Sequence, residues 1–201
     1  MSTEWSFTEW FRKVSRWLVI PAAGFLARLG LSANTLTIIG CLLNVGVGVV
    51  LATGRLRLGG ICLIVAAGFD ALDGTLARQT NGATQFGAFL DSVLDRVSES
   101  VVLLGLAWWY MGQPGRMQEM LVYAVIVGSM LVSYTRARAE GIGVECKVGV
   151  FDRVLRAVLL IAGLILGLLE PTLWLLAIGT TATTIRRIVT VYLKSRDQML
   201  G

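Results

Sequence analysis

The 201-residue sequence contains no histidine. This absence excludes the Ser-His-Asp triad, the usual imidazole base and most zinc sites. Acid–base chemistry must therefore come from carboxylates, Lys, Tyr or Cys. Only three cysteines are present, Cys41, Cys62 and Cys146, and their spacing matches no metal-binding or redox motif. We expect them to be small core residues rather than parts of a disulfide scaffold.

Charged residues are also scarce. They make up 15% of the chain, against about 25% in a soluble domain, and 55% of the residues are hydrophobic. The apolar residues stand in long blocks, which is typical of a polytopic membrane protein. Because a backbone surrounded by lipid must satisfy its own hydrogen bonds, and because the blocks lack the alternation of a barrel, we predict helical spans.

Six apolar stretches can be marked along the chain. They cover roughly 35–52, 58–79, 86–111, 117–138, 153–169 and 171–192, each near the ~20 residues that cross a bilayer. We therefore predict an all-α fold with six transmembrane helices, forming a single membrane domain over residues 1–201. Residues 1–34 interleave aromatic and basic side chains at helical spacing, which predicts a juxtamembrane amphipathic helix lying in the membrane interface.

The distribution of Lys and Arg predicts the orientation. If the N-terminus is inside, all 18 Lys and Arg residues except Arg55, Arg57 and Arg116 fall on the cytoplasmic side. The positive-inside rule then places both termini and the active site in the cytoplasm, and we expect a multi-pass protein of a prokaryotic cell membrane. The net charge of +5 follows from this bias and from contact with anionic headgroups or phosphates. Nucleic-acid binding is not expected, because the basic residues are spread among the helix ends.

Four aspartates flank the turn between the second and third stretches. Asp70 and Asp73 are three residues apart, and Asp91 and Asp95 are four apart, so each pair shares one helix face. An antiparallel hairpin through the intervening Asn-Gly turn brings the pairs together. Four carboxylates that converge in a low-dielectric environment cannot all stay ionised unless a cation binds between them. Oxygen ligands favour Mg²⁺, Mn²⁺ or Ca²⁺ over zinc, as one ion or two.

The same segment leaves three other interpretations open. The aspartates could form an ion-pair network with Arg78 or Arg96, they could be the ion site of a cation transporter, or the chain could be a structural membrane protein. A transporter has no need for Gly74, Arg78 and Gly87 at their spacing, and a structural protein leaves the acids unexplained. Glycines that admit a substrate to the backbone, and an arginine that can hold phosphate, favour an enzyme.

The segment resembles a known family signature. Its spacing is Asp70-x2-Asp73-Gly74-x2-Ala77-Arg78-x8-Gly87-x3-Asp91-x3-Asp95. This pattern is similar at every fixed position to the signature of the CDP-alcohol phosphotransferase family, and the predicted helices resemble that family's architecture. The resemblance implies a phosphatidyltransferase that uses CDP-diacylglycerol or an ether-lipid counterpart. It also implies one or two bound ions of Mg²⁺, or alternatively of Mn²⁺. The protein would form a homodimer and would contact membrane lipids.

The resemblance also implies roles for single residues. Asp70, Asp73 and Asp91 would bind metal, and Asp95 would bind metal and act as the catalytic base. The residues that would meet the CDP moiety are Gly74, Arg78 and Thr84, with Asn34 and Thr37 from a segment similar to the family's Pro-Asn-x-x-Thr motif. Ala33 stands here in place of the proline. A helix-capping role stays open for Asn34.

The acceptor is indicated by basic residues near the predicted inner ends of the last three spans. Such a cationic cluster suits a phosphorylated alcohol. The segment 133–141, SYTRARAEG, resembles the phosphatidylinositol-phosphate synthase branch, which uses inositol phosphate. The acceptor-phosphate site implied by this resemblance is Ser133, Arg136, Arg153 and Arg187. Glycerol-3-phosphate, the acceptor of a phosphatidylglycerol-phosphate synthase, is the alternative. Positive-inside anchoring is our explanation for Lys194 and Arg196, and an alternative one for Arg156.

Overall fold

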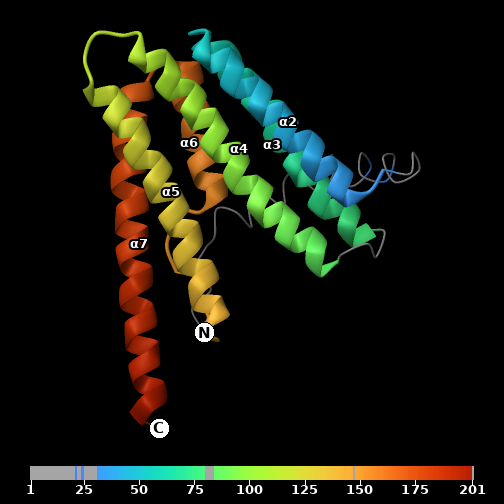
Figure 1. Cartoon of the computed structure of the whole chain (residues 1–201), viewed down its shortest axis with the longest axis vertical. Coiled ribbons are helices and arrows are strands. Elements are labelled where there is room, and N and C mark those ends of the chain that lie inside the picture. The colour runs from blue at the N-terminus through green and yellow to red at the C-terminus, as the bar shows by residue number, and fades with distance from the viewer. Residues whose placement is uncertain (1–20, 22–23, 25–30, 80–83, 147, 201) are drawn as a thin grey trace. The chain divides into compact units, whose positions relative to one another are not determined.

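The described part of the chain consists of helices joined by loops and contains no strand (Figure 1). The computed structural model describes residues 21, 24, 31–79, 84–146 and 148–200. Its helices are α2 (Ala33–Ala52), α3 (Leu56–Gln79), α4 (Gln85–Met111), α5 (Met117–Gly141), α6 (Arg153–Leu166) and α7 (Leu169–Leu200). Each corresponds to one of the predicted apolar stretches, although α6 ends three residues before the stretch 153–169 does, and the predicted all-α class is confirmed. The predicted amphipathic helix within 1–34 lies almost wholly outside the described residues.

Local capping residues determine where two of these helices begin. The hydroxyl of Ser32 accepts a hydrogen bond from the Thr35 amide at 3.1 Å, which caps α2. The Asp152 carboxylate accepts from the Leu155 amide at 2.9 Å and caps α6 in the same way. Helix α6 ends at Leu166, and the next residue, Gly167, caps it with a φ of 74°, a left-handed conformation that glycine adopts without a Cβ penalty.

The chain divides into two compact units. The first spans residues 1–106 and contains α2, α3 and most of α4. Helices α2 and α3 run side by side as a hairpin (Figure 1), and their shared core includes the buried residues Leu36 and Leu76. Helix α4 approaches α2 where Gly48 meets Val101 and Gly105, and a Cβ on Gly105 would overlap the Gly48 main chain. These glycines let two helix backbones touch.

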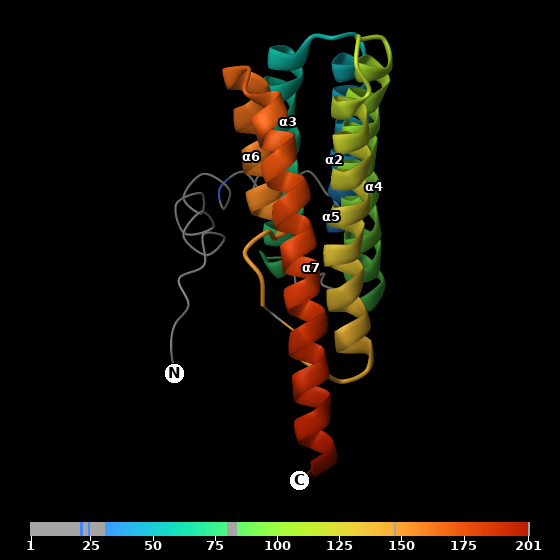
Figure 2. The same ribbon diagram turned by 90° about the vertical axis from the view of Figure 1, so that its left-hand side faces the viewer.

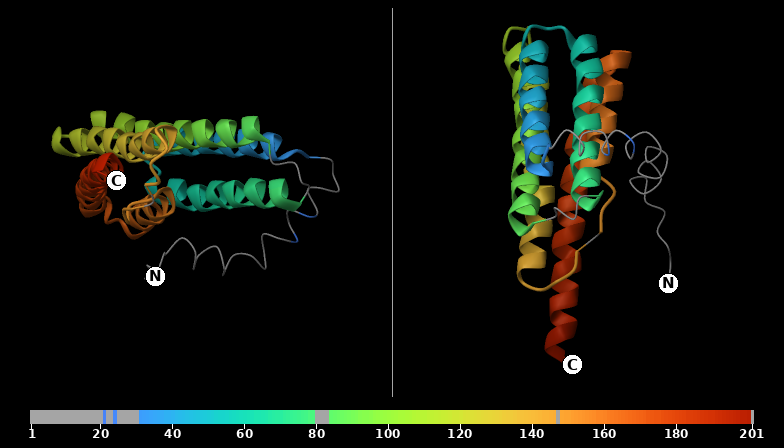
Figure 3. Two further views of the ribbon diagram at one scale, coloured as in Figure 1. Left: turned by 90° about the horizontal axis from the view of Figure 1, so that it is seen from below. Right: turned by 90° about the vertical axis from the view of Figure 1, so that its right-hand side faces the viewer.

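The second unit spans residues 107–201. In it α5 and α7 lie side by side (Figure 2), and α6 packs against α7 (Figure 3, left). Helices α5 and α7 run in the same direction, because Gly128 meets Thr180 and, further along both helices, the Val132 carbonyl meets Arg187. Small residues again permit the close approach, since a Cβ on Gly128 would overlap Thr180.

Two of the described helices, α2 and α5, are long and apolar enough to cross a membrane. The six predicted spans are therefore supported only in part. Helix α6 has 14 residues, or about 21 Å at 1.5 Å per residue, which is shorter than a hydrocarbon core of about 30 Å. Large apolar side chains are nevertheless exposed outside α2 and α5, including Trp108 of α4 and Ile178 and Tyr192 of α7. Such outward-facing apolar side chains suit lipid better than water.

Candidate active site

Asp70 of α3 lies against the backbone of α2. The position that a Cβ would occupy on Gly40 is only 2.8 Å from Asp70 Oδ1, so the carboxylate rests where a side chain is missing. The Gly40 carbonyl accepts a hydrogen bond at 2.9 Å from the side-chain amide Nδ2 of the buried Asn44, which holds this turn of α2 in place. The α2 backbone therefore forms the wall that positions the first of the four aspartates.

The second pair of carboxylates lies on α4. Asp91 and Asp95 are one turn apart on the same helix face, and both are half-buried. Arg96, which follows Asp95, donates a hydrogen bond to the main-chain oxygen of Ser92 in its own helix. The first aspartate pair therefore belongs to α3 and the second to α4, and their convergence stays a prediction.

Four further residues of the signature have their backbone in α3, but their side chains are outside the described part of the structure. They are Asp73, Gly74, Ala77 and Arg78. Among the side chains that are described, no three His, Cys, Asp or Glu residues gather closely enough to hold a metal ion. The chemistry of the set still fits a hard divalent cation, because its members offer only carboxylate oxygens. Coordination by the four aspartates stays a prediction.

The start of α4 brings together residues that are distant in sequence. The Thr84 hydroxyl accepts a hydrogen bond from the Gly87 amide at 2.9 Å. A Cβ on Gly87 would lie 2.9 Å from Asn34 Oδ1 and 3.0 Å from Thr84 Oγ1, so the side chains of Asn34 and Thr84 approach the same glycine. The capping role considered for Asn34 is filled by Ser32. Asn34 and Thr84 of the predicted CDP site therefore both lie beside Gly87 of the signature.

Thr37, the other α2 residue of the predicted CDP site, is buried. Its hydroxyl donates to the Ala33 carbonyl one turn earlier at 3.0 Å. This bond satisfies the hydroxyl proton within α2, and only its oxygen lone pairs are left for a ligand. A CDP contact from Thr37 is therefore restricted to accepting a hydrogen bond while that bond lasts.

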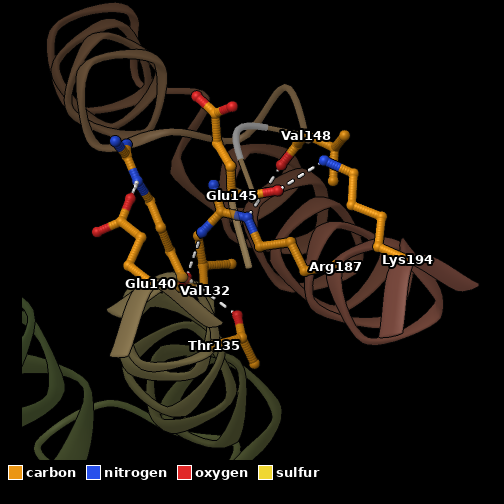
Figure 4. A network of polar contacts seen from close by, with 8 residues as sticks. Val132, Thr135, Glu140, Glu145, Val148, Arg187 and Lys194 are labelled. Carbon is orange, nitrogen blue, oxygen red and sulfur yellow. Dashed lines mark hydrogen bonds and ion pairs between the residues drawn. The ribbon is translucent and has the colours of Figure 1, made fainter. Parts of the chain in front are cut away.

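The predicted acceptor-phosphate residues lie in the second unit, on α5, α6 and α7. Arg187 is only 4% exposed; its Nε donates to the Val148 carbonyl at 2.9 Å, and Nη1 donates to the Val132 carbonyl (Figure 4). Arg136 pairs with Glu140 at 2.9 Å, and both side chains are about half-exposed. Ser133 is half-buried on α5, and Arg153 is the half-buried first residue of α6.

Comparison with known proteins decides the family. The sequence model of the CDP-alcohol phosphatidyltransferases matches residues 31–192, most of the chain. The chain belongs to this family. The phosphatidyltransferase is 35% identical over 191 residues to a phosphatidylinositol phosphate synthase of Mycobacteroides abscessus, covering 90% of this chain and 84% of that one. It is 37% identical over 165 residues to an archaetidylinositol phosphate synthase of Methanothermobacter thermautotrophicus, covering 82% and 80%.

Solved structures agree with this assignment. The phosphatidyltransferase matches the crystal structure of Mycobacterium tuberculosis phosphatidylinositol phosphate synthase in complex with manganese and citrate, with a TM-score of 0.82 and 31% identity over 87% of this chain and 88% of that one. The same enzyme with CDP-DAG bound gives a TM-score of 0.82 and 31% identity, covering 87% and 93%. The predicted family is confirmed, and the chain is a membrane-lipid enzyme that transfers a phosphatidyl-type group from a CDP-linked donor to an alcohol.

Sequence reasoning missed several contacts that the structure shows. The contact between Gly40 and Asp70 is one of them, and nothing in the local sequence marked it. Lys194 was explained by membrane orientation, yet its Nζ donates to the Glu145 carbonyl at 2.7 Å (Figure 4). Arg156 is 3% exposed and donates to a loop carbonyl. Anchoring at the membrane surface therefore does not explain Arg156.

Proposed function

We propose that this phosphatidyltransferase moves the phosphatidyl-type group of CDP-diacylglycerol, or of an ether-lipid analogue, onto inositol phosphate and releases CMP. The relatives named above support this acceptor. The observation that carries it is that two arginines from different helices meet one loop, since Arg187 of α7 binds that loop at Val148 and Arg153 of α6 directly follows it. With Ser133 and Arg136 of α5 they supply the cations and hydroxyl that an acceptor phosphate needs.

The donor nucleotide is assigned to the first unit. Asn34 and Thr84 offer an amide and a hydroxyl beside Gly87, where the missing side chain leaves room for both of them at the start of α4. Gly74 and Arg78 of α3 complete the proposed CDP site, with the Thr37 oxygen as an acceptor. The CDP-DAG complex of the Mycobacterium tuberculosis enzyme supports a CDP-linked donor for this chain.

The four aspartates are assigned to divalent metal. Asp70, Asp73, Asp91 and Asp95 would hold Mg²⁺, or alternatively Mn²⁺, as one or two ions; the related Mycobacterium tuberculosis enzyme was crystallised with manganese. Such an ion supplies charge neutralisation for a pyrophosphate. The role of Gly40 in this assignment is to leave room for the Asp70 carboxylate, and the role of α4 is to present Asp91 and Asp95 one turn apart.

Asp95 is assigned the proton transfer. The acceptor hydroxyl attacks the phosphorus that carries the diacylglycerol, a new P–O bond forms, and the bond from that phosphorus to the oxygen of CMP breaks. Asp95 accepts the hydroxyl proton as this happens. Arg78 offsets charge on the departing CMP. The transfer is direct, so no covalent bond between enzyme and lipid is needed.

The enzyme is further proposed to act as one membrane domain over residues 1–201. It would cross the membrane six times, with both termini and the active site in the cytoplasm of a prokaryotic cell, and would form a homodimer. The positive-inside bias and the outward-facing apolar side chains of the helices support the membrane arrangement.

The acceptor can be tested directly with purified protein in vesicles that contain CDP-diacylglycerol and Mg²⁺. Radiolabelled inositol phosphate and glycerol-3-phosphate are offered side by side, and Asp95→Asn is the control. We expect label from inositol phosphate to enter lipid and the Asn variant to incorporate none. Incorporation from glycerol-3-phosphate alone would keep the reaction class and overturn the acceptor.

A further inference from the structure

The loop between α5 and α6 is fastened along one face of α7. The loop residues described are 142–146 and 148–152. The α7 residues that hold it are Gly179, Thr183, Arg187 and Lys194, whose spacing places them on one helix face. The loop therefore takes its position from α7 over about four helical turns.

Three kinds of contact secure the loop. Its carbonyl groups at Glu145 and Val148 accept hydrogen bonds from Lys194 and Arg187, as Figure 4 shows. Its side chain at Cys146 is fully buried. Its backbone at Gly149, with a φ of 108°, lies so close to Thr183 that a Cβ would overlap that side chain.

The last contact before α6 is made by an aromatic ring. The far end of the Phe151 ring lies directly on Gly179 of α7, where an alanine methyl group would overlap the ring carbons. The Phe151 carbonyl accepts a hydrogen bond from the buried Arg156 at 3.0 Å, and the next residue, Asp152, caps α6. The ring on one side and the cap on the other therefore determine where α6 begins, and the first residue of α6 is Arg153.

We propose that Phe151, seated on Gly179, is a positioning residue that places Arg153 for the phosphate of the acceptor alcohol. The proposal rests on the proposed function, in which Arg153 binds that phosphate. Recognition of phosphate by a guanidinium depends on direction, because its donors form a planar fork. A displaced start of α6 turns or shifts this fork, whereas the donor nucleotide, assigned to the other unit, is bound by different residues.

The chain offers a matched control for this contact. Gly163 of α6 meets Thr172 of α7 at the opposite end of the same helix pair, and a Cβ there would also overlap its neighbour. Alanine at either glycine introduces a clash of similar overlap: Gly163→Ala between α6 and α7, and Gly179→Ala between α7 and the loop residue Phe151 just before α6. Only Gly179→Ala does so beside Arg153. A purely structural role for Phe151 predicts the same outcome for both variants.

The experiment is steady-state kinetics of the full-length protein in vesicles, with inositol phosphate and CDP-diacylglycerol each varied. We expect Gly179→Ala to raise the KM for inositol phosphate about tenfold, as when one charge-assisted hydrogen bond is lost, and to change the KM for the CDP-lipid less than about twofold. Phe151→Leu added to Gly179→Ala removes the overlapping ring carbons and should restore the acceptor KM to within about threefold. Gly163→Ala should leave both KM values unchanged.

Two further variants separate the possible failures. Phe151→Ala adds no clash and should also raise the acceptor KM, so it replaces Gly179→Ala if that variant does not fold. Arg153→Ala tests the proposed function itself. If it raises the acceptor KM while Gly179→Ala and Phe151→Ala do not, the positioning role is wrong and the proposed site stands. If Arg153→Ala leaves the acceptor KM unchanged, the proposed site fails and the positioning role fails with it.

Discussion

Replacing Gly40 with alanine would put a methyl group 2.8 Å from Asp70 Oδ1. Ordinary van der Waals contact begins at 3.4 Å, so the carboxylate would have to retreat by about 0.6 Å. Metal sites hold their ligand distances to about 0.2 Å, and this displacement is several times larger. If Asp70 is a metal ligand, we expect the affinity for Mg²⁺ to fall by about 10- to 100-fold, as for other changes that misplace a ligand.

The same substitution should have little effect on folding. Alanine is favoured over glycine in a helix by about 1 kcal/mol, which offsets part of the clash. Gly46 of the same helix supplies the matched control, because a Cβ there would meet nothing within 4 Å. Gly46→Ala therefore gains the same helix preference without touching the site.

The assay is CMP release from CDP-diacylglycerol at increasing Mg²⁺ in the presence of inositol phosphate. Gly40→Ala should need about 10- to 100-fold more Mg²⁺ for half-maximal activity and should recover activity as Mg²⁺ is raised. Gly46→Ala should match the unmodified protein. Equal Mg²⁺ dependence in both variants, with both folded, would refute the placement of Asp70 beside the metal.

Three other changes give distinct outcomes. Gly87→Ala should raise the KM for the CDP-lipid about tenfold in kinetic assays. The reason is that the new methyl group would lie 2.9 Å from Asn34 Oδ1 and 3.0 Å from Thr84 Oγ1 and would displace both side chains. An unchanged KM would show that these residues are not part of the donor site. Arg187→Lys should lower the free energy of unfolding by about 1–3 kcal/mol in denaturant titrations. Lysine cannot keep both hydrogen bonds that the buried guanidinium donates to the Val148 and Val132 carbonyls. A smaller change would show that other donors satisfy these carbonyls in the variant. Ser32→Ala should lower stability by about 1 kcal/mol through loss of the α2 cap while turnover of the folded protein stays the same.

Much of the fold was predictable because lipid as a solvent simplifies the sequence pattern. Long apolar blocks separated by polar turns gave helix positions close to those of α2 to α7, and the signature from Asp70 to Asp95 placed the aspartate pairs on α3 and α4. The short α6 corresponds to the shortest of these stretches. The number of membrane crossings was less well supported, because among the described helices only α2 and α5 are long and apolar enough to cross a membrane.

The contacts between helices could not be predicted, because they depend on which residues face each other across the bundle. Nothing in the local sequence distinguishes Gly40, which admits Asp70, from Gly46, which faces open space. Lys194 illustrates a second limit. Its position near a helix end suggested membrane anchoring, yet its side chain binds a loop carbonyl that lies 49 residues away in sequence. Long-range pairing of this kind leaves no local signal.

The central claim is a direct, metal-assisted transfer that depends on the carboxylates of α3 and α4. The most direct test is a measurement of CMP and lipid product together, in vesicles with CDP-diacylglycerol and inositol phosphate, with and without a chelator and with Asp95→Asn. The account predicts one CMP for each lipid product, with both lost on chelation and in the variant. Release of CMP that continues at the same rate after chelation, or in Asp95→Asn, would contradict it.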